Sequence, residues 1–321
     1  MPGPEPILGE FGLIAAIRRR SPAGDRIAIG IGDDCASIRF APGAEVLVTT
    51  DMLMEGRHFL ADDPPDAVGY KCLGVNLSDI AAMAGRPVAA VVSVALPAGR
   101  AVEVGLGLHG GMSRLADDLG VGLVGGDTNA WDGPLVVSIT ALGEATGRGP
   151  VRRSGARAGD AILVTGALGG SLLGRHLRPA PRVREALALH AATDLHAMID
   201  LSDGLAGDLA HILAESGGLG ATLDAEAIPI HADALEAARR DGRPALDHAL
   251  GDGEDFELCF TLDESEAARL LARPPGGREL YRVGTVDERP GLRLLRGDGR
   301  VEPCRMRGFD HLAAPPRPAG A

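Results

Sequence analysis

The sequence has almost no lysine and few aromatic residues. Among its 32 basic residues only Lys71 is a lysine, and Phe, Trp and Tyr together make up 3% of the 321 residues. A phosphate-binding loop of the Walker A type needs a lysine directly after its glycines, and no such motif is present. The sequence therefore excludes a nucleotide site of that type, and it confines Schiff-base chemistry to one position.

Paired cysteines, long apolar runs and an excess of positive charge are also missing. The four cysteines form no CxxC pair and follow no secretory signal, and no apolar run reaches the length of a membrane helix. The formal net charge of −12 disfavours general nucleic-acid binding. We therefore expect a soluble, cytoplasmic protein that binds neither nucleic acid nor membrane. The excess of acids suits a protein that binds divalent cations.

Glycine and aliphatic residues are abundant instead. The chain has 46 glycines and is 45% hydrophobic, which is typical of a globular protein with tight turns and small-residue packing. Apolar, β-branched runs at 45–51, 88–97 and 135–145 alternate with helical patterns, and the basic, glycine-rich segment 146–160 resembles a domain junction. These patterns predict two α/β or α+β domains, residues 1–148 and 149–321, with a flexible tail after about 311.

The stretch IDLSDGLAGDLAHILAESGG, residues 199–218, predicts an amphipathic helix from its leucine spacing. Its first turns are crowded with Asp200, Ser202, Asp203 and Asp208. Helix capping explains one or two of these residues, because Ser and Asp accept hydrogen bonds from free backbone N–H groups. The segment VNLSDIAAM at 75–83 has the same order of residues. The match is short, but an ancient duplication of a metal site at a helix start would leave such a repeat.

Several acids lie where an apolar strand ends or a helix begins, beside Gly, Ser, Thr or aliphatic residues. Helix caps, buried ion pairs and sites for hard cations are the three explanations of this placement. For a single acid, such as Asp79 or Asp203, a cap is a fair explanation. The whole set favours cation sites: Asp33, Asp34, Asp51, Asp79, Asp127, Asp200 and Asp203.

Three glycine-rich turns, GIGDD, VGGDT and TGALGG, leave backbone N–H groups open to an anion. Together with the acids they indicate phosphate groups bridged by metal ions, which is the equipment of a phosphoryl-transfer enzyme. Arg153, in the segment VRRSGARAGD, is a candidate for assisting the transfer. A solvated basic linker explains Arg153 almost as well.

The motifs as a set resemble the thiamine-monophosphate kinase family, from about residue 9 to 310. This family shares its fold with aminoimidazole ribonucleotide synthetase, selenophosphate synthetase and the hydrogenase-maturation dehydratase. The resemblance implies two domains with mixed sheets flanked by helices. The motifs that carry it are GEFGLIAAI, GIGDDCA, TTDMLMEGRHF, YKCLGVNLSDIAAMAG, GGDT, RSGARAGD, IDLSDGLAGDL and GDGEDFELCF.

The resemblance implies ATP-dependent phosphorylation of thiamine monophosphate to thiamine diphosphate, with several Mg²⁺ ions and a homodimer formed by the N-terminal domains. It assigns magnesium binding to Asp34, Thr49, Thr50, Asp51, Asp79, Asp127, Asp200 and Asp203. It assigns nucleotide binding to Gly126, Asp127, Arg153 and Ser202, and substrate binding to His58, Glu254 and Met306. Met306 stands where the family has an aromatic residue, with Phe309 nearby. Asp208 has no role in the family pattern.

The substrate phosphate is already anionic at neutral pH, so we expect direct transfer, without a covalent nucleophile, an obligatory base or a phosphoenzyme. Three alternatives stay open. One is another ATP-dependent synthetase or dehydratase of the same fold, although the chain lacks the early Cys–Lys pair and the cysteine tail of those enzymes. The others are a metal-dependent phosphohydrolase, although TTDMLM lacks the second acid of a DxD motif, and a non-catalytic nucleotide or Mg²⁺ sensor.

Overall fold

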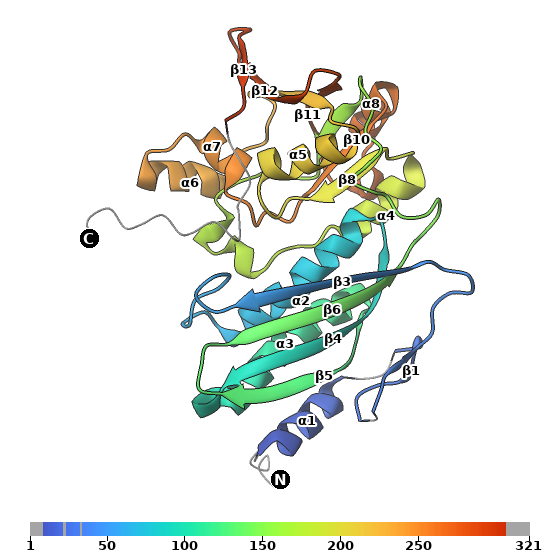
Figure 1. Cartoon of the computed structure of the whole chain (residues 1–321), viewed down its shortest axis with the longest axis vertical. Helices are drawn as coiled ribbons and strands as arrows, with labels where there is room; N and C mark the ends of the chain where they lie inside the picture. Colours follow the sequence, from blue (N-terminus) through green and yellow to red (C-terminus); the bar gives the residue numbers. More distant parts are fainter. Residues whose placement is uncertain (1–8, 22–23, 33, 306–321) are drawn as a thin grey trace.

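A four-stranded sheet organises the first half of the chain (Figure 1). The computed structural model describes residues 9–21, 24–32 and 34–305. The strands lie in the order β3 (Val46–Met54), β6 (Val136–Glu144), β4 (Arg86–Pro97) and β5 (Gly122–Trp131). Neighbouring strands are antiparallel except β4 and β5, which are parallel. β3 and β5 are therefore the two edges of this sheet.

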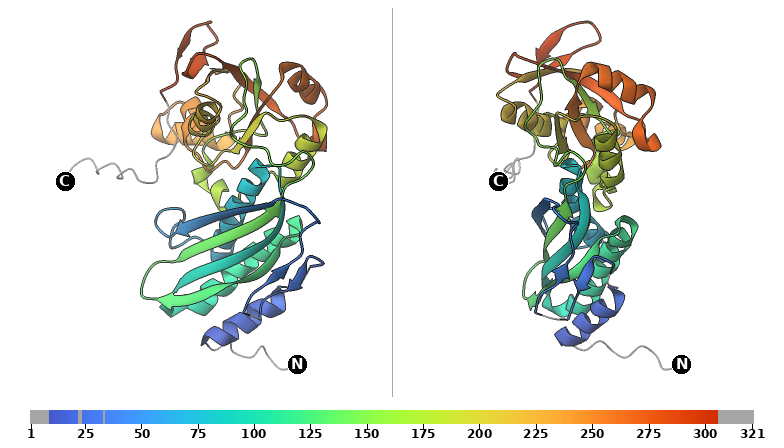
Figure 2. Two further views of the ribbon diagram at one scale, coloured as in Figure 1. Left: turned by 45° about the vertical axis from the view of Figure 1, so that its right-hand side comes forward. Right: turned by 90° about the vertical axis from the view of Figure 1, so that its right-hand side faces the viewer.

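Helices cover one face of this sheet only (Figure 2). α2 (Pro65–Ala82) and α3 (Ala101–Leu119) pack on it and on each other. Their backbones approach so closely that a Cβ atom at Gly111 would lie 1.8 Å from the carbonyl oxygen of Asp66. Gly69 is in the same position against Leu108, at 2.1 Å. Part of the high glycine content therefore serves helix packing.

The second face of this sheet is open among the described residues and carries apolar side chains. Because side chains alternate along a strand, Val46, Val48, Met52 and Met54 all point to this face from β3. Met52 is 58% exposed and Val48 63%. α1 (Gly9–Arg20) packs on α3, and the short pair β1 (Ile27–Ile29) and β2 (Ser37–Ile38) lies beside β5 (Figure 1).

A seven-stranded sheet organises the second half of the chain. Its strand order is β13-β12-β9-β11-β7-β10-β8, and only β9 and β12 are parallel. The strands are β7 (Ala161–Val164), β8 (Ala197–Asp200), β9 (Gly220–Asp224), β10 (Leu258–Leu262), β11 (Tyr281–Asp287), β12 (Gly291–Leu295) and β13 (Val301–Pro303).

Both faces of this sheet are buried, because alternate residues of its central strands enter two different cores. Ile162 and Val164 of β7 pack with α5 (Leu205–Glu215) and α7 (Ala245–Gly251), and α6 (Ala232–Asp241) packs on α7. Ala161 and Leu163 pack with α4 (Val183–Ala192) and α8 (Glu264–Ala272) on the other face. The mixed sheets flanked by helices confirm the predicted fold class.

The prediction for residues 199–218 was wrong in its first part. Residues up to Asp200 belong to β8, and α5 begins only at Leu205. The residue before the helix is Gly204, with φ 99°, and no side chain caps it. Asp79 lies near the end of α2, not at a helix start. The capping explanation of Asp79 is therefore wrong, and so is the idea of two repeated helix starts.

Some expectations fall on residues outside the described ranges. These are Asp33, Met306, Phe309 and the tail after 311. Within the described part, none of the four cysteines forms a disulfide. No helix in that part is long and apolar enough to cross a lipid bilayer.

Candidate active site

A cleft of about 390 Å³ lies where the two domains meet. The N-terminal domain contributes the end of β3 (residues 51–54), the turn that follows it and α2. The C-terminal domain contributes the end of β8 and a loop that leads into β10. The lining residues are Asp51, Met52, Leu53, Met54, Arg57, His58, Lys71, Val75, Asp79, Asp200, Ser202, Asp203, Glu254 and Phe256.

β3 sorts the residues of the TTD motif between the two faces of the sheet. Asp51 and Thr49 lie on the face toward α2, and Thr49 donates a hydrogen bond from Oγ1 to Oδ2 of Asp79 at 2.5 Å. Thr50 lies on the opposite, open face, where its hydroxyl donates to the carbonyl oxygen of Ile139 at 3.1 Å. The structure thus separates Thr50 from the two neighbours with which it was grouped as a magnesium ligand.

The two Leu-Ser-Asp motifs meet across the domain boundary. Ser78 of α2 donates a hydrogen bond from Oγ to Oδ2 of Asp200 at 2.6 Å, and both side chains are buried. α2 therefore carries one acid, Asp79, and positions another, Asp200, which comes from the second domain. Asp51, Asp79 and Asp200 are called the cleft acids below.

Burial and mutual repulsion disfavour the ionised forms of the cleft acids. Burial raises the pKa of Asp51 to about 6, and the nearby Asp79 carboxylate adds to the rise. Burial raises the pKa of Asp200 to about 7, again with Asp79 contributing. The pKa of Asp79 is raised by burial as well, while Thr49 and the Arg153 guanidinium oppose the rise. Arg153 therefore lies close enough to act on the cleft acids, although its own side chain is exposed.

The oxygen atoms of the cleft acids and of Thr49 suit Mg²⁺ as part of a coordination shell. Carboxylate and hydroxyl oxygens are the ligands that hard cations prefer, and a divalent ion would relieve the repulsion among the cleft acids. In the described residues, however, no three His, Cys, Asp or Glu side chains are placed to hold one ion by themselves. Such ions would need oxygens from phosphate and water to complete their shells, which is usual for Mg²⁺ in phosphoryl-transfer sites.

The other predicted metal and nucleotide residues lie at the far edge of the N-terminal sheet. Asp127 is exposed on β5 and accepts a hydrogen bond from Nδ2 of Asn129 at 2.8 Å, and Gly126 precedes it. Asp34 is exposed and follows β1, a strand that contacts β5. Three strand spacings separate β5 from β3, or roughly 14 Å. One chain therefore does not bring Asp127 to the cleft acids.

A second, apolar cavity of about 160 Å³ lies beside Gly126 and Asp127. Its walls come from α1, α3 and β4 and include Leu13, Met112 and His109. Burial lowers the pKa of His109, so the ring is neutral at physiological pH. His109 was not predicted as a functional residue, because the sequence shows it only as a histidine within an apolar helix.

The predicted substrate residues His58 and Glu254 both line the cleft, from different domains. The backbone N–H of Met54 donates to Nδ1 of His58 at 3.0 Å, which orients the ring. The buried ammonium group of Lys71 lies 2.5 Å from Oε2 of Glu254. No role in substrate binding was predicted for Lys71, which stands out in the sequence only as its single lysine.

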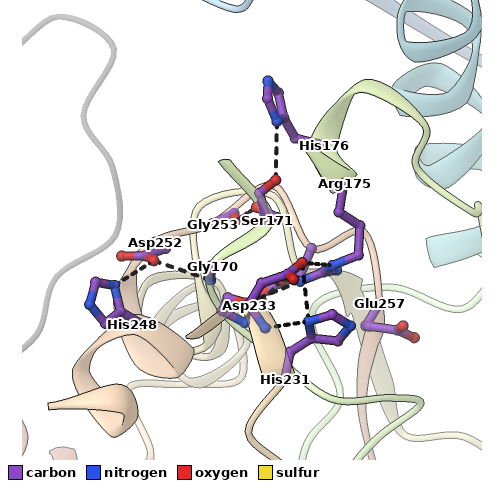
Figure 3. Close-up of polar contacts among 12 residues, drawn as sticks. Gly170, Ser171, Arg175, His176, His231, Asp233, His248, Asp252, Gly253 and Glu257 are labelled. Carbon is purple, nitrogen blue, oxygen red and sulfur yellow. Dashed lines mark hydrogen bonds and ion pairs between the residues drawn. The ribbon is translucent and has the colours of Figure 1, made fainter. Parts of the chain in front are cut away.

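Two backbone donors of the glycine-rich turn TGALGG are occupied by carboxylates of the chain itself. The backbone N–H of Gly169 donates to the carboxylate of Asp255 at 2.9 Å. The N–H of Gly170 donates to Asp252 at 3.2 Å, and Ser171 donates to the carbonyl oxygen of Gly253 at 2.7 Å (Figure 3). The prediction that this turn leaves its N–H groups open to an anion is therefore wrong for Gly169 and Gly170.

The loop held by this turn is rich in acids, and most have basic partners. Arg175 bonds to Asp255 at 2.9 Å and also reaches Asp233. Burial raises the pKa of Asp255 to about 6, although the Gly169 N–H and Arg175 oppose the rise. Asp252 contacts Nδ1 of His248 at 2.7 Å. Asp252, Asp255 and Glu257 are called the loop acids below.

Glu257 forms a buried ion pair with Arg182. Its carboxylate bonds to Nε of Arg182 at 2.6 Å and also contacts the second guanidinium nitrogen, so the pairing is bidentate. Thr165 donates a further hydrogen bond to Glu257 at 2.7 Å. The side chains of Glu257 and Arg182 are 5% and 11% exposed. This network fixes the loop to the base of β7 and to α4.

Asp208 is a further acid that sequence reasoning dismissed. It is buried in the first turn of α5, and its Oδ2 accepts a hydrogen bond from the backbone N–H of Asp203 at 3.0 Å. Burial raises its pKa to about 8, and the charges of Asp200 and Asp203 add to the rise. Its signal in the sequence was a polar residue on the apolar face of the helix.

Comparison with known proteins matches this architecture. Residues 32–145 match the family model of the AIR synthase related protein, N-terminal domain, and residues 152–296 match that of the C-terminal domain. The thiamine-monophosphate kinase of Rhodopirellula baltica is 41% identical over 310 residues, which cover 94% of this chain and 97% of that protein. The chain belongs to the thiamine-monophosphate kinase family.

Solved structures of the thiamine-monophosphate kinase family agree with the fold. The crystal structure of the enzyme from Stenotrophomonas maltophilia K279a is 37% identical, with a TM-score of 0.77, and covers 91% of this chain and 98% of its own. A complex of AaThiL with AMPPCP and TMP is 30% identical, with a TM-score of 0.73, and covers 94% and 97%. Both likenesses span the two domains and the cleft between them.

Proposed function

We propose that this cleft transfers the terminal phosphate of ATP to thiamine monophosphate and forms thiamine diphosphate. The observation that carries the proposal is the meeting of the cleft acids, from two domains, in one cavity with His58 and Glu254. Acids without enough basic partners attract divalent cations and, through them, phosphate groups. Membership of the thiamine-monophosphate kinase family supplies the identity of the two substrates.

We propose that Mg²⁺ binds to Thr49, to the cleft acids and to Asp203, on the cleft side. When bound, Mg²⁺ neutralises phosphate charge and supports the loose transition state of phosphoryl transfer. Arg153 and Ser202 border the same region and serve the nucleotide phosphates. The acceptor oxygen is anionic at neutral pH, so positioning and charge neutralisation carry the reaction without a protein nucleophile.

The substrate side of the cleft is assigned to His58 and Glu254. Because Nδ1 of His58 accepts the Met54 N–H, the neutral ring carries its proton on Nε2 and can donate it to a phosphate oxygen. Glu254 offers a carboxylate to the thiamine moiety from the second domain. The role of Met306 remains a prediction, since this residue lies outside the described part of the chain.

We further propose a homodimer formed by the N-terminal domains, residues 1–148. A contiguous apolar surface such as the open face of the sheet commonly marks an interaction site. A second copy with its β5 edge next to the β3 edge of the first would bring its Asp127 and Gly126 toward the cleft acids. The dimer would thus reunite the two groups of predicted ligands that a single chain keeps apart, with Asp34 and Thr50 near the junction.

The apolar cavity beside β5 suits the base of the nucleotide. It offers aliphatic walls and His109, and its lining includes Gly126, where a Cβ atom would lie 1.9 Å from the carbonyl oxygen of Val92. A purine in this cavity would place its phosphates at the β5 edge. In the proposed dimer the terminal phosphate would then face the partner's cleft.

The activity is tested with purified protein, ATP, Mg²⁺ and thiamine monophosphate, by measuring thiamine diphosphate. We expect product formation that stops when a chelator removes the divalent ions and resumes when Mg²⁺ is restored. Absence of product with every divalent ion tried would overturn the proposal. Binding of ATP without ADP formation would favour a nucleotide sensor instead.

The dimer is tested by placing a charge on the open face with Val48→Asp, at a residue that is 63% exposed and does not line the cleft. We expect a monomer by light scattering and loss of most of the turnover, because the β5 residues are then missing from the site. Leu235→Asp is the matched control, since Leu235 is 47% exposed on α6, away from the sheet. A monomeric Val48→Asp variant with full activity would show that one chain suffices.

A further inference from the structure

Lys71 is buried in the middle of α2, with no exposed surface. An ammonium group is strongly hydrated in water, and its burial is unfavourable unless partners replace the water. Two partners do so. Nζ donates a hydrogen bond to the carbonyl oxygen of His58 at 2.6 Å and lies 2.5 Å from Oε2 of Glu254. The position of the ammonium group is thereby tied to both.

The two partners of Lys71 come from different domains. His58 follows β3 in the N-terminal domain, and Glu254 belongs to the loop before β10 in the C-terminal domain. Both are assigned above to the binding of thiamine monophosphate. One ammonium group therefore joins the two residues that are expected to hold the substrate from opposite sides.

Glu254 differs from the three loop acids around it. Those acids bond to the glycine-rich turn, to Arg175 and to Arg182, all within the C-terminal domain. Asp252 also contacts His248 (Figure 3). In the described residues, the ion pair of Glu254 is instead with the N-terminal domain, through Lys71. The loop is thus anchored on one side and presents a single carboxylate to the cleft.

The backbone of the loop is held in a conformation that supports this presentation. Glu254 and Phe256 have φ values of 56° and 51°, in the left-handed region that residues with a Cβ atom rarely adopt. The N–H of Glu254 donates to the carbonyl oxygen of Ser202 at 2.7 Å, and that of Phe256 donates to Leu201 at 2.9 Å. Such strain persists only where the surroundings fix the backbone, and it is common at ligand sites.

We propose that Lys71 is a positioning residue for the thiamine end of the substrate. It fixes the Glu254 carboxylate and the His58 turn relative to each other, and so it sets the width of the substrate site across the domain boundary. The inference rests on the proposed substrate roles of His58 and Glu254. It assigns Lys71 no contact with ATP and no chemical step.

The test compares Lys71→Met with wild type in the full enzyme with Mg²⁺, by steady-state kinetics for both substrates. Methionine keeps the length of the side chain and suits a buried site, but it lacks the donor. We expect the KM for thiamine monophosphate to rise at least about tenfold, the effect of losing a charge-assisted hydrogen bond. The KM for ATP should stay within about twofold, because the nucleotide residues are untouched. Lys71→Gln carries the same expectation and replaces Lys71→Met if that variant does not fold.

Arg178→Met is the matched control. Arg178 belongs to the C-terminal domain and pairs with Asp66 in the first turn of the same helix, at 2.9 Å, outside the cleft and with its side chain 50% exposed. The Arg178→Met variant therefore breaks an ion pair between the domains and leaves the substrate site unchanged. We expect both KM values to stay within about twofold of wild type.

A double-mutant cycle with Glu254→Gln completes the test. Glu254→Gln alone should raise the KM for thiamine monophosphate, and Lys71→Met should then add less than about twofold, because its partner is already lost. Fully additive effects, or equal rises in both KM values, would overturn the role of Lys71.

If Glu254→Gln raises the KM for thiamine monophosphate but Lys71→Met does not, only this inference fails. If Glu254→Gln has no effect, the proposed substrate role of Glu254 fails, and the inference with it.

Discussion

The protein contains two groups of buried acids that are treated in opposite ways. The cleft acids lie near one another, and the polar groups around them are hydroxyls and one exposed arginine. Their pKa values are raised by burial and by mutual repulsion. The loop acids each have a backbone N–H, an arginine or a histidine as a direct partner. Each group consists of three acidic residues, so residue type alone does not distinguish the two groups.

The difference shows what each group is for. Paired acids give the loop a fixed shape, because an ion pair with several hydrogen bonds satisfies the charge within the protein. Acids that are short of partners raise the free energy of the folded protein, and the proposed Mg²⁺ ions would compensate their charge. A loop fixed by ion pairs thus lies beside a cleft in which carboxylates repel one another.

The largest effect is expected from removing charge in the cleft. Asp51→Asn and Asp200→Asn should each lower kcat by about a thousandfold or more, since phosphate charge would no longer be neutralised correctly. Both variants should fold, and circular dichroism checks this. Asp298→Asn, in an exposed turn where Asp298 pairs with Arg300, is the control and should retain full turnover. Near-normal kcat in both cleft variants would contradict the shared-metal site.

Breaking the scaffold should affect stability more than chemistry. Arg182→Met leaves Glu257 buried without its cation, so we expect the free energy of unfolding to fall by about 3–5 kcal/mol. Urea denaturation measures the loss. The double variant Arg182→Met/Glu257→Leu should recover most of it, because no buried charge remains. A single variant as stable as wild type would show that the pair does not support the loop.

The pH dependence of the metal-free protein should reveal the cleft acids. Their folded pKa values, about 6 for Asp51 and about 7 for Asp200, lie above the unfolded value, so protonation favours folding. Stability from these groups is complete below about pH 4 and is lost as the pH rises through the folded pKa values. Mg²⁺ should therefore raise the Tm more at pH 8 than at pH 5, by differential scanning calorimetry. An equal rise at both pH values would argue against metal binding to these acids.

The smallest effect is expected from Asp208→Asn. The amide can still accept the Asp203 N–H but carries no charge, and burial already raises the pKa of Asp208 to about 8. We expect the metal-free Tm at pH 9 to rise by about 3 °C and to stay unchanged at pH 5, where Asp208 is already protonated. A lower Tm at pH 9 would show that the ionised form is needed for the fold.

Much of the fold was predictable from local patterns. The apolar runs that became β3, β4 and β6 were identified because β-branched residues repeat in short blocks. The start of α5 was not, because Leu201, which follows β8, continues the helical spacing of the leucines of α5. Only hydrogen bonding of β8 to β10 decides that Ile199 belongs to a strand.

The sequence by itself determined the chemistry of this protein. Acids next to glycine and serine at strand ends, with one lysine and no Walker A motif, indicated metal-bridged phosphate, and the motif order indicated the family. Tertiary structure alone decided which acids act together. It placed Asp51, Asp79 and Asp200 in one cleft and Asp127 at the opposite edge, and it filled the TGALGG turn with the loop acids. The physical reason is that a residue type reports its own chemistry, whereas partners far apart in sequence are chosen by sheet order and domain packing.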